Sequence, residues 1–248
     1  MNSVATSFVV LSALLAAIFL GSRLRRRLPD SHRDSETKDA VKLAMGMVAT
    51  MSALLLGLLV SSAKSSYDSV RSQVIQMGAN VQFLDRVLRI YGPESQELRI
   101  RFHGAIESAI GEMWSEREGA APPDVHTGDA LYGAIQGLAP RDEVQRALKA
   151  QAVQLAVDLA QRRTLLHAQS VASISRPLLV MVVVWLVIIL FSFSLVAPRN
   201  ATAFLAQVVA AFAVTGAIYL ILEMDRPFSG LVHVSSAPLA NALIAIRP

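Results

Sequence analysis

The stretch VKLAMGMVATMSALLLGLLVSSA at residues 41–63 decides the fold, together with KSSYDSVRSQVIQMGANVQFLDRVLRIY, which follows it at residues 64–91. Residues 41–63 are apolar on all sides and match the roughly 20 residues that cross a bilayer core of about 30 Å. Residues 64–77 contain neither Pro nor Gly, so nothing ends the helix at residue 63. The sequence therefore predicts a helix that spans a membrane and continues beyond it.

Three more apolar runs of similar length lie at residues 4–21, 177–197 and 201–222. None of the four runs has an acidic or basic residue in its interior. A buried helix of a soluble protein would show a polar stripe at the 3.6-residue period, and these runs do not. We therefore expect an all-α integral membrane protein, with four transmembrane helices in two pairs and an extramembrane helical region between the pairs.

The expected organisation has four parts. A first transmembrane pair occupies residues 1–63, a helical region residues 64–176, a second pair residues 177–226 and a tail residues 227–248. The helical region contains long helices that continue the second and third spans.

The composition agrees with a membrane protein, since 53% of the residues are hydrophobic and 17% are charged. The net charge of +4 would also suit a nucleic-acid partner, but the basic residues gather beside the spans, so we expect no nucleic acid. Because the chain has no Cys, it forms no disulfide, no thiolate metal site and no cysteine nucleophile.

The basic residues also orient the chain. The first apolar run has no basic residue before it and several after it, the reverse of a secretory signal peptide, so we expect a retained anchor. The first and third connections carry Arg23, Arg25, Arg26, Arg27, Arg33, Lys38, Lys42 and Arg199. The opposite side carries Arg226 and Arg247, if the long middle segment is discounted. This bias places the N-terminus and the middle region outside, in a multi-pass protein of a bacterial inner membrane.

A second count weakens the bias, because the flanks of the middle segment are themselves basic. They add Lys64, Arg71, Arg162, Arg163 and Arg176 to the outer side. The charge pattern then favours neither orientation strongly.

Apolar residues recur at steps of four and three beyond the second span, which is a heptad seam. The seam consists of Val70, Val74, Met77, Val81, Leu84, Leu88 and Tyr91, and Gly92 and Pro93 end the helix. Further helices are expected at about residues 94–116, 129–138 and 140–175. The last has a seam of its own at Val144, Leu148, Leu155, Leu159 and Leu166. The two seams pack together within one subunit or form a coiled coil between subunits.

The tail has two interpretations. Residues 241–246 form a short helix that lies in the headgroup zone, with Leu243 and Ile246 in the membrane interface, or the tail packs against the helical bundle.

No residues are arranged for catalysis. The histidines His32, His103, His126, His167 and His233 lack the three- or four-residue spacing of metal ligands, and no phosphate loop or nucleophile elbow is present. We expect no enzyme, no metal and no cofactor.

Charged residues at the span ends are expected at the membrane interface. Glu223 and Asp225 follow the fourth span, where a carboxylate at membrane depth is a candidate functional group. The simpler interpretation is that they end the helix together with Arg226. Arg199 marks the interface between the third and fourth spans.

The second span carries a small residue at every fourth position, namely Ala49, Ala53, Gly57 and Ser61. Such a stripe lets one flank of a helix approach the backbone of a neighbour, which is the simpler interpretation. The alternative is a pore lining, because small side chains leave room for an ion. The hydroxyls of Ser61, Ser62 and Ser65 would then replace part of the hydration shell of an anion, and Lys64 would attract anions or merely anchor the helix by snorkelling.

Four segments resemble DUF4239, a family of bacterial membrane proteins of unknown function described as bestrophin-like. They are GLLVSSAKSSYD at residues 57–68, LDRVLRIYGPE at 84–94, APRNAT at 197–202 and LILEMDRPFSGLVHVSSAPL at 220–239. The resemblance covers essentially the whole chain in order. It implies a distant likeness to bestrophins, which are pentameric anion channels with paired spans around a helical cytosolic region, and it points to the second span as the pore lining.

Two features depart from bestrophins. The second span has no Phe like those of the bestrophin neck, and Met45, Met47, Met51 and residues 54–56 fill the comparable stretch. Bestrophins also place the middle region in the cytosol, whereas the charge count favours the outside.

The leading hypothesis is a homo-oligomeric protein of the lipid bilayer that conducts chloride or another small anion. The alternative is a non-conducting scaffold or sensor, in which the helical middle region binds a partner and the spans anchor it. A membrane enzyme ranks third, because no acid, base or nucleophile stands out.

Overall fold

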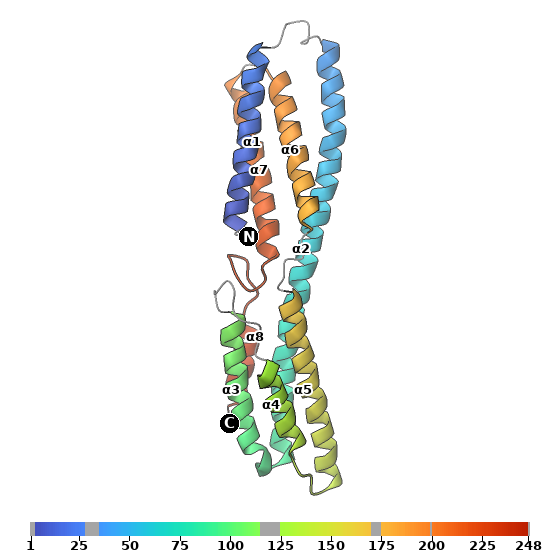
Figure 1. The fold of residues 1–248 in the computed structure, drawn as a ribbon, viewed down its shortest axis with the longest axis vertical. Helices are drawn as coiled ribbons and strands as arrows, with labels where there is room; N and C mark the ends of the chain where they lie inside the picture. Colours follow the sequence, from blue (N-terminus) through green and yellow to red (C-terminus); the bar gives the residue numbers. More distant parts are fainter. Residues whose placement is uncertain (1–2, 28–34, 115–124, 170–174, 199, 248) are drawn as a thin grey trace. The chain divides into compact units, whose positions relative to one another are not determined.

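The computed structural model describes residues 3–27, 35–114, 125–169, 175–198 and 200–247. In these ranges all the regular secondary structure is helical (Figure 1). The α-helices are α1 (Ser3–Leu24), α2 (Ser35–Tyr91), α3 (Gln96–Met113), α4 (Val125–Gln136), α5 (Glu143–Gln169), α6 (Arg176–Val196), α7 (Ala201–Met224) and α8 (Ala237–Ala245); the short 3-10 helices are η1 (Arg25–Arg27) and η3 (Pro93–Ser95). The predicted all-α class is confirmed.

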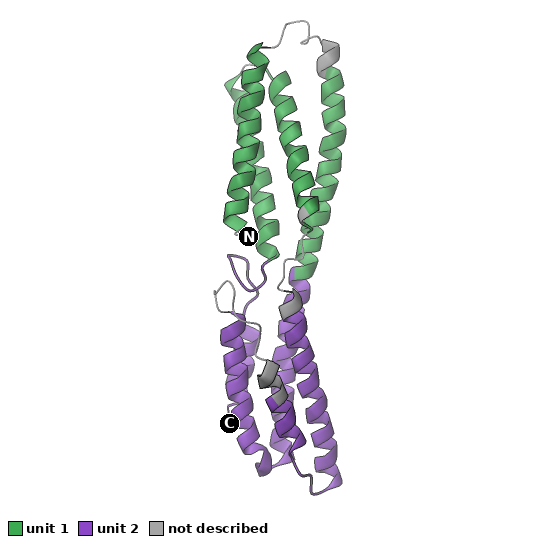
Figure 2. Cartoon of the chain, in the orientation of Figure 1, with its two compact units in different colours: residues 1–66, 173–225 green, residues 67–172, 226–248 purple. Residues whose placement is uncertain are grey.

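The chain divides into two compact units, which Figure 2 shows in different colours. Unit 1 consists of residues 1–66 and 173–225, and unit 2 of residues 67–172 and 226–248. The helix α2 contributes to both units, as the sequence predicted from its lack of a break after the second span. The sequence also predicted that the helix of residues 140–175 continues into the third span. This junction includes residues 170–174, which lie outside the described residues; α5 ends at Gln169, and Ser175 is extended just before α6 begins at Arg176.

Unit 1 is the membrane unit, since it contains four helical segments that are long and apolar enough to cross a bilayer. Within it, α1 and α6 run in one direction and α2 and α7 in the other (Figure 1). The helix α1 packs against both α6 and α7. The core includes Leu14 and Ile18 of α1, Val182 of α6, and Ala211 and Ile218 of α7. All four predicted spans are therefore present.

A close contact fixes α1 against α6. The hydroxyl of Ser194 donates a hydrogen bond to the carbonyl oxygen of Ile18 at 2.7 Å. A Cβ atom at Gly21 would lie 2.8 Å from the carbonyl oxygen of Phe191, so only glycine fits without a shift of the backbone there. Small residues at this contact let the two helices approach closely, as in other membrane helix pairs.

Unit 2 is built around the predicted heptad seam of α2. All seven seam residues are buried, and Leu155, Leu159 and Leu166 of α5 pack in the same core. The seams therefore meet within one subunit. Val144 was expected in the α5 seam, but its side chain is 66% exposed, because the next residue, Gln145, is the one that contacts α2, donating to the carbonyl oxygen of Tyr91 at 2.9 Å.

The tail belongs to the core of unit 2. Leu239 and Ala242 of α8 and the following Ile246 are buried there, and the carbonyl oxygen of Pro238 would lie 2.8 Å from a Cβ atom at Gly78. Trp114 donates a hydrogen bond from its indole N–H to the carbonyl oxygen of Val234 at 2.8 Å. The interpretation of a packed tail is correct, and the helix in the headgroup zone is not observed.

The end of α2 is fixed by its turn and by an ion pair. Gly92 has a φ of 126°, a conformation that favours glycine, and Pro93 begins η3, so the predicted stop is confirmed. Next to this turn, the Nε of Arg99 on α3 donates to the Oδ1 of Asp85 on α2 at 2.7 Å, and both side chains are buried. A buried charge without its partner is costly, so this pair holds α3 in its place.

Replacement of Asp85 tests that role. Asp85→Ala leaves the Arg99 guanidinium buried without its carboxylate, and we expect a loss of about 3–5 kcal/mol in the unfolding free energy of unit 2. The measurement is urea unfolding in detergent with Trp114 as the fluorescent reporter, in a Trp185→Phe background. Glu97→Ala is the control, because its partner Arg101 is exposed, and we expect a change below about 1 kcal/mol. Equal losses in both variants would contradict the assignment.

Candidate functional site

The second span is the most exposed part of the membrane unit. In the most apolar window of α2, 11% of the residues are buried, against 33% in the corresponding window of α1. Long apolar side chains cover much of its exposed surface, with exposed fractions of 74% for Leu43, 71% for Met47, 71% for Leu54 and 58% for Leu58. In a single subunit this span therefore carries a face that no other part of the described chain covers.

The small-residue stripe of α2 divides between two surroundings. Ala49 and Ala53 line a cavity in unit 1. Gly57 is exposed, and a Cβ atom at this position would meet nothing within 4 Å. Ser61 is exposed as well. Around Gly57 the stripe is thus not a packing surface within the subunit, and it is available to a pore, to lipid or to a second subunit.

The polar residues at the end of the span are also exposed. The side chains of Ser61, Ser62, Lys64 and Ser65 all lie at the surface of unit 1. Three hydroxyls and one ammonium group within five residues give this part of α2 the donors that an anion requires.

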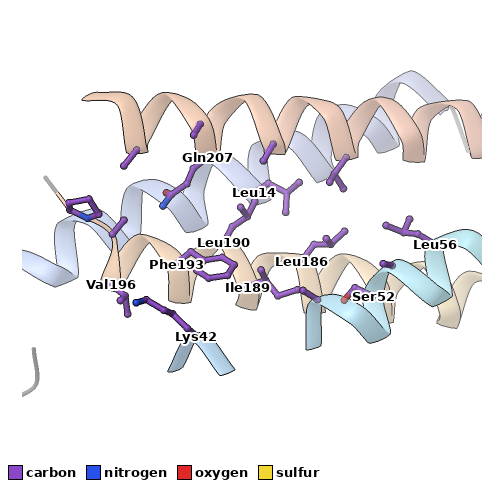
Figure 3. Close-up of a pocket in the computed structure, with 18 residues that line it drawn as sticks. Leu14, Lys42, Ser52, Leu56, Leu186, Ile189, Leu190, Phe193, Val196 and Gln207 are labelled. Atoms are coloured by element: carbon purple, nitrogen blue, oxygen red, sulfur yellow. The ribbon is translucent and has the colours of Figure 1, made fainter. Parts of the chain in front are cut away.

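A cavity of about 720 Å³ lies among the four spans of unit 1. Its walls are almost entirely apolar, and Figure 3 shows Leu14, Leu186 and Leu190 among them. Its polar lining residues are Lys42 and Ser52 of α2 and Gln207 of α7. In Figure 3, Lys42 lies beside Val196 at one end of the cavity, and Leu56 lies toward the other end.

The three polar side chains of the cavity differ in their hydrogen bonding. The Ser52 hydroxyl donates to the carbonyl oxygen of Val48 at 2.8 Å in its own helix. Lys42 forms an ion pair with Asp39 at 2.9 Å, and both side chains are well exposed. Among the described residues, none forms a hydrogen bond with the Gln207 side chain, which reaches into the cavity from α7 (Figure 3). Of the three side chains, that of Gln207 is therefore the one that can hydrogen-bond to a molecule bound in the cavity.

The acidic residues at the end of α7 are more enclosed than the sequence indicated. The helix ends at Met224, where Asp225 follows as the capping residue. The exposed fractions are 3% for Glu223 and 8% for Asp225. Arg226 is half-buried, and Arg199 lies outside the described residues. Tyr219, one turn earlier, forms a hydrogen bond with Glu223.

No metal site is found in the part of the chain that the structure describes, where no three His, Asp or Glu side chains gather around a common point. The side chains of His32, His126 and His167 lie outside the part of the chain that the structure describes.

Sequence reasoning missed two features of unit 1. The first is the small-residue face of α1, where Ser3, Ser7, Ala17 and Gly21 are buried. Ser3 and Ser7 are four residues apart, as are Ala17 and Gly21, and this spacing was visible in the sequence. The second is the cavity, whose residues come from four helices far apart in the chain. In the sequence, Gln207 was merely one scattered polar residue in an apolar run.

Comparison with known proteins decides the family. A model of the bestrophin-like domain matches residues 12–239, which is nearly the whole chain. The chain belongs to the bestrophin-like family. The match includes most of the first span, the other three spans and the helical region between the two pairs. No curated protein sequence matches this bestrophin-like chain.

Solved structures share the fold. A variant of a bacterial bestrophin homologue from Klebsiella pneumoniae aligns with a TM-score of 0.67 at 12% identity, covering 99% of this chain and 97% of the other. A second variant of the same homologue gives a TM-score of 0.63 at 14% identity, over 82% and 83% of the two chains. A structure described as a membrane protein gives 0.68 at 14% identity, over 99% and 98%. At these identities the comparison establishes the fold alone.

Two glycines of unit 1 should differ in their response to substitution by alanine. Gly21→Ala places a methyl group against the Phe191 carbonyl, and we expect a loss of about 1–3 kcal/mol in the stability of unit 1. Gly216→Ala is the control, since a Cβ atom there meets nothing within 4 Å. The measurement is thermal unfolding in detergent followed by Trp185 fluorescence, in a Trp114→Phe background. Similar midpoints for the two variants would contradict the close α1–α6 contact.

Proposed function

We propose that this bestrophin-like protein is a homo-oligomeric channel for chloride or another small anion, with the α2 helices of the subunits facing a central axis. Within the family we place it in the DUF4239 group. The observation that carries the proposal is the exposed face of α2, where Gly57 has open space around it. The related fold of bacterial bestrophin homologues supports the same arrangement.

The chemistry of α2 suits an anion path. An anion that leaves water needs hydrogen-bond donors or positive charge in return, and Ser61, Ser62 and Ser65 offer hydroxyls beside Lys64. Next along the span, Leu54 and Leu58 are exposed and apolar. Rings of such side chains around an axis form a hydrophobic constriction, which gates by excluding water.

Apolar residues of α2 outside the membrane unit support assembly. In unit 2, Ile75, Phe83 and Ile90 have exposed fractions of 49%, 45% and 60%, at spacings of eight and seven residues. Such spacings place the three side chains on one side of the helix, away from the buried seam. Lipid covers apolar residues in a bilayer but not in water, so a second subunit is the partner that fits this face.

The Gly57→Leu variant tests the pore lining. In liposomes with a chloride gradient, we expect flux to fall by about tenfold or more, because four added carbons per subunit narrow a pore lined by this position. Folding should be preserved, since the side chain enters open space within the subunit.

Gly216→Leu is the matched control, because Gly216 is also an exposed glycine in a span with nothing within 4 Å of its Cβ position. Its flux should equal that of the unchanged protein. Unchanged flux in Gly57→Leu, from an oligomer of normal size, would contradict the proposal.

The orientation is part of the proposal. Because the chain has no Cys, single cysteines report their own exposure. We expect Ser108→Cys on α3 to react with an impermeant maleimide in spheroplasts, and Ala201→Cys at the start of α7 to react only after lysis, as the basic first and third connections require. The opposite labelling pattern would place the middle region in the cytoplasm.

A second candidate function is that of a non-conducting scaffold or sensor. The observation in its favour is the single helix α2, which runs from Ser35 to Tyr91 and belongs to both units. A helix that both units share is a direct path along the chain for a displacement to pass from one unit to the other. A folded oligomer that passes neither chloride nor potassium, and a specific soluble protein crosslinked to unit 2 of the full chain, would favour this function.

A further inference from the structure

The cavity of unit 1 has the shape and chemistry of a binding site that conduction does not explain. Its volume of about 720 Å³ lies within the range of about 300–1,000 Å³ that small-molecule sites occupy. The residues that line it come from α1, α2, α6 and α7, so the space lies among the helices of one subunit. An occupant must be slender enough to lie between helices.

Water does not suit most of this space. A buried water molecule needs two to four polar partners, and the walls are formed mainly by Ala, Leu, Ile and Val. Ser52 already donates its hydroxyl hydrogen to its own helix. The space therefore favours an apolar occupant, which in a membrane unit is a hydrocarbon chain.

The polar side chains at one end of the cavity favour an occupant with a polar head group. Lys42 and Gln207 lie toward the same end of the cavity, and Leu56 and Leu186 lie further along it (Figure 3). Gln207 is the seventh residue of α7, which places it about 9 Å along the helix at 1.5 Å per residue. This depth suits a group just below a lipid phosphate. An amide without a partner in a membrane span is costly, and an ester carbonyl of the occupant would accept its hydrogen bond.

The charge at that end favours an anion. Arg23 on α1 and the three arginines of η1 lie at the end of unit 1 where α2 begins, and η1 contacts α6 (Figure 1). Lys42 forms an ion pair with Asp39, which offsets its positive charge. Arg23, Arg26 and Arg27 are exposed and add positive charge to this end of unit 1. Basic groups at the membrane surface attract the phosphates of anionic lipids.

We propose that the cavity binds an anionic glycerophospholipid, with one acyl chain among the four spans, an ester carbonyl at the Gln207 amide and the phosphate at Lys42. The bound chain fills the space between α2 and the α1–α6–α7 packing, and so supports the span that has the fewest buried residues of its own. The proposal does not depend on ion conduction.

The test measures lipid retained by the purified full-length oligomer. Protein is incubated with phosphatidylglycerol or phosphatidylcholine in detergent, and bound lipid is counted by native mass spectrometry. Ala206→Phe fills the cavity from α7, and we expect retained phosphatidylglycerol to fall by about tenfold or more. Ala213→Phe is the control, because Ala213 is exposed on the same helix and is not among the lining residues.

Two further variants test the polar end. Gln207→Leu keeps the volume and removes the amide, and we expect weaker retention of both lipids. Lys42→Gln removes the charge, and we expect the preference for phosphatidylglycerol over phosphatidylcholine to fall severalfold. Equal retention in Ala206→Phe and Ala213→Phe, or no retained lipid in a well-folded oligomer, would overturn the proposal.

A photocrosslink distinguishes lipid from a neighbouring subunit. A benzoylphenylalanine in place of Ala206 is irradiated in membranes, and the product is analysed by mass. An adduct of lipid mass is the expected result. A covalent dimer would show that a second copy fills the cavity, and would overturn the lipid proposal without affecting the proposed channel.

Discussion

The structure depends on the constraint that every backbone N–H and C=O group in a bilayer must be hydrogen-bonded within the protein. The spans are therefore helices, and α2 meets this constraint without a break from Ser35 to Tyr91. In unit 1 the same helix is mainly apolar and long enough to span a bilayer, and in unit 2 it has a single buried seam. One continuous helix thus extends through the bilayer and beyond it, and only the pattern of its side chains differs between the two parts.

The spans differ in how they are packed within the subunit. The helix α1 carries the tight contacts, through Gly21 against α6 and the buried small residues on its face. The helix α2 is fixed more by unit 2, where Leu84 and Leu88 are fully buried and Asp85 holds Arg99. The membrane segment of α2 is left with an exposed face and a cavity beside it. Each subunit therefore has packed cores of its own but leaves an apolar face of α2 uncovered. A second subunit or a lipid fits that face and the cavity beside it.

Much of this fold was predictable, because its strongest signals are local. The length of the apolar runs predicts the spans, the four-and-three spacing from Val70 to Tyr91 predicts the buried seam, and Gly92 with Pro93 predicts the end of α2. Partner choice is not local. The sequence allowed the α2 seam to pair within or between subunits, and it placed Val144 in the α5 seam, although the neighbouring Gln145 makes the contact with α2 and Val144 is exposed. The cavity required the relative placement of four helices, and Gln207 has no distinguishing pattern in the sequence.

The central claim is that the exposed face of α2 lines the conduction path. Because the chain has no Cys, single cysteines along the span report on that face directly. The measurement is chloride flux from liposomes during treatment with a charged methanethiosulfonate reagent. The account predicts that reagent changes the flux of Gly57→Cys and Ser61→Cys, and leaves that of Leu59→Cys and Val209→Cys unchanged, since Leu59 is buried and Val209 lies on the exposed surface of α7. A flux that is insensitive at Gly57 and Ser61, or sensitive at Val209, would contradict it.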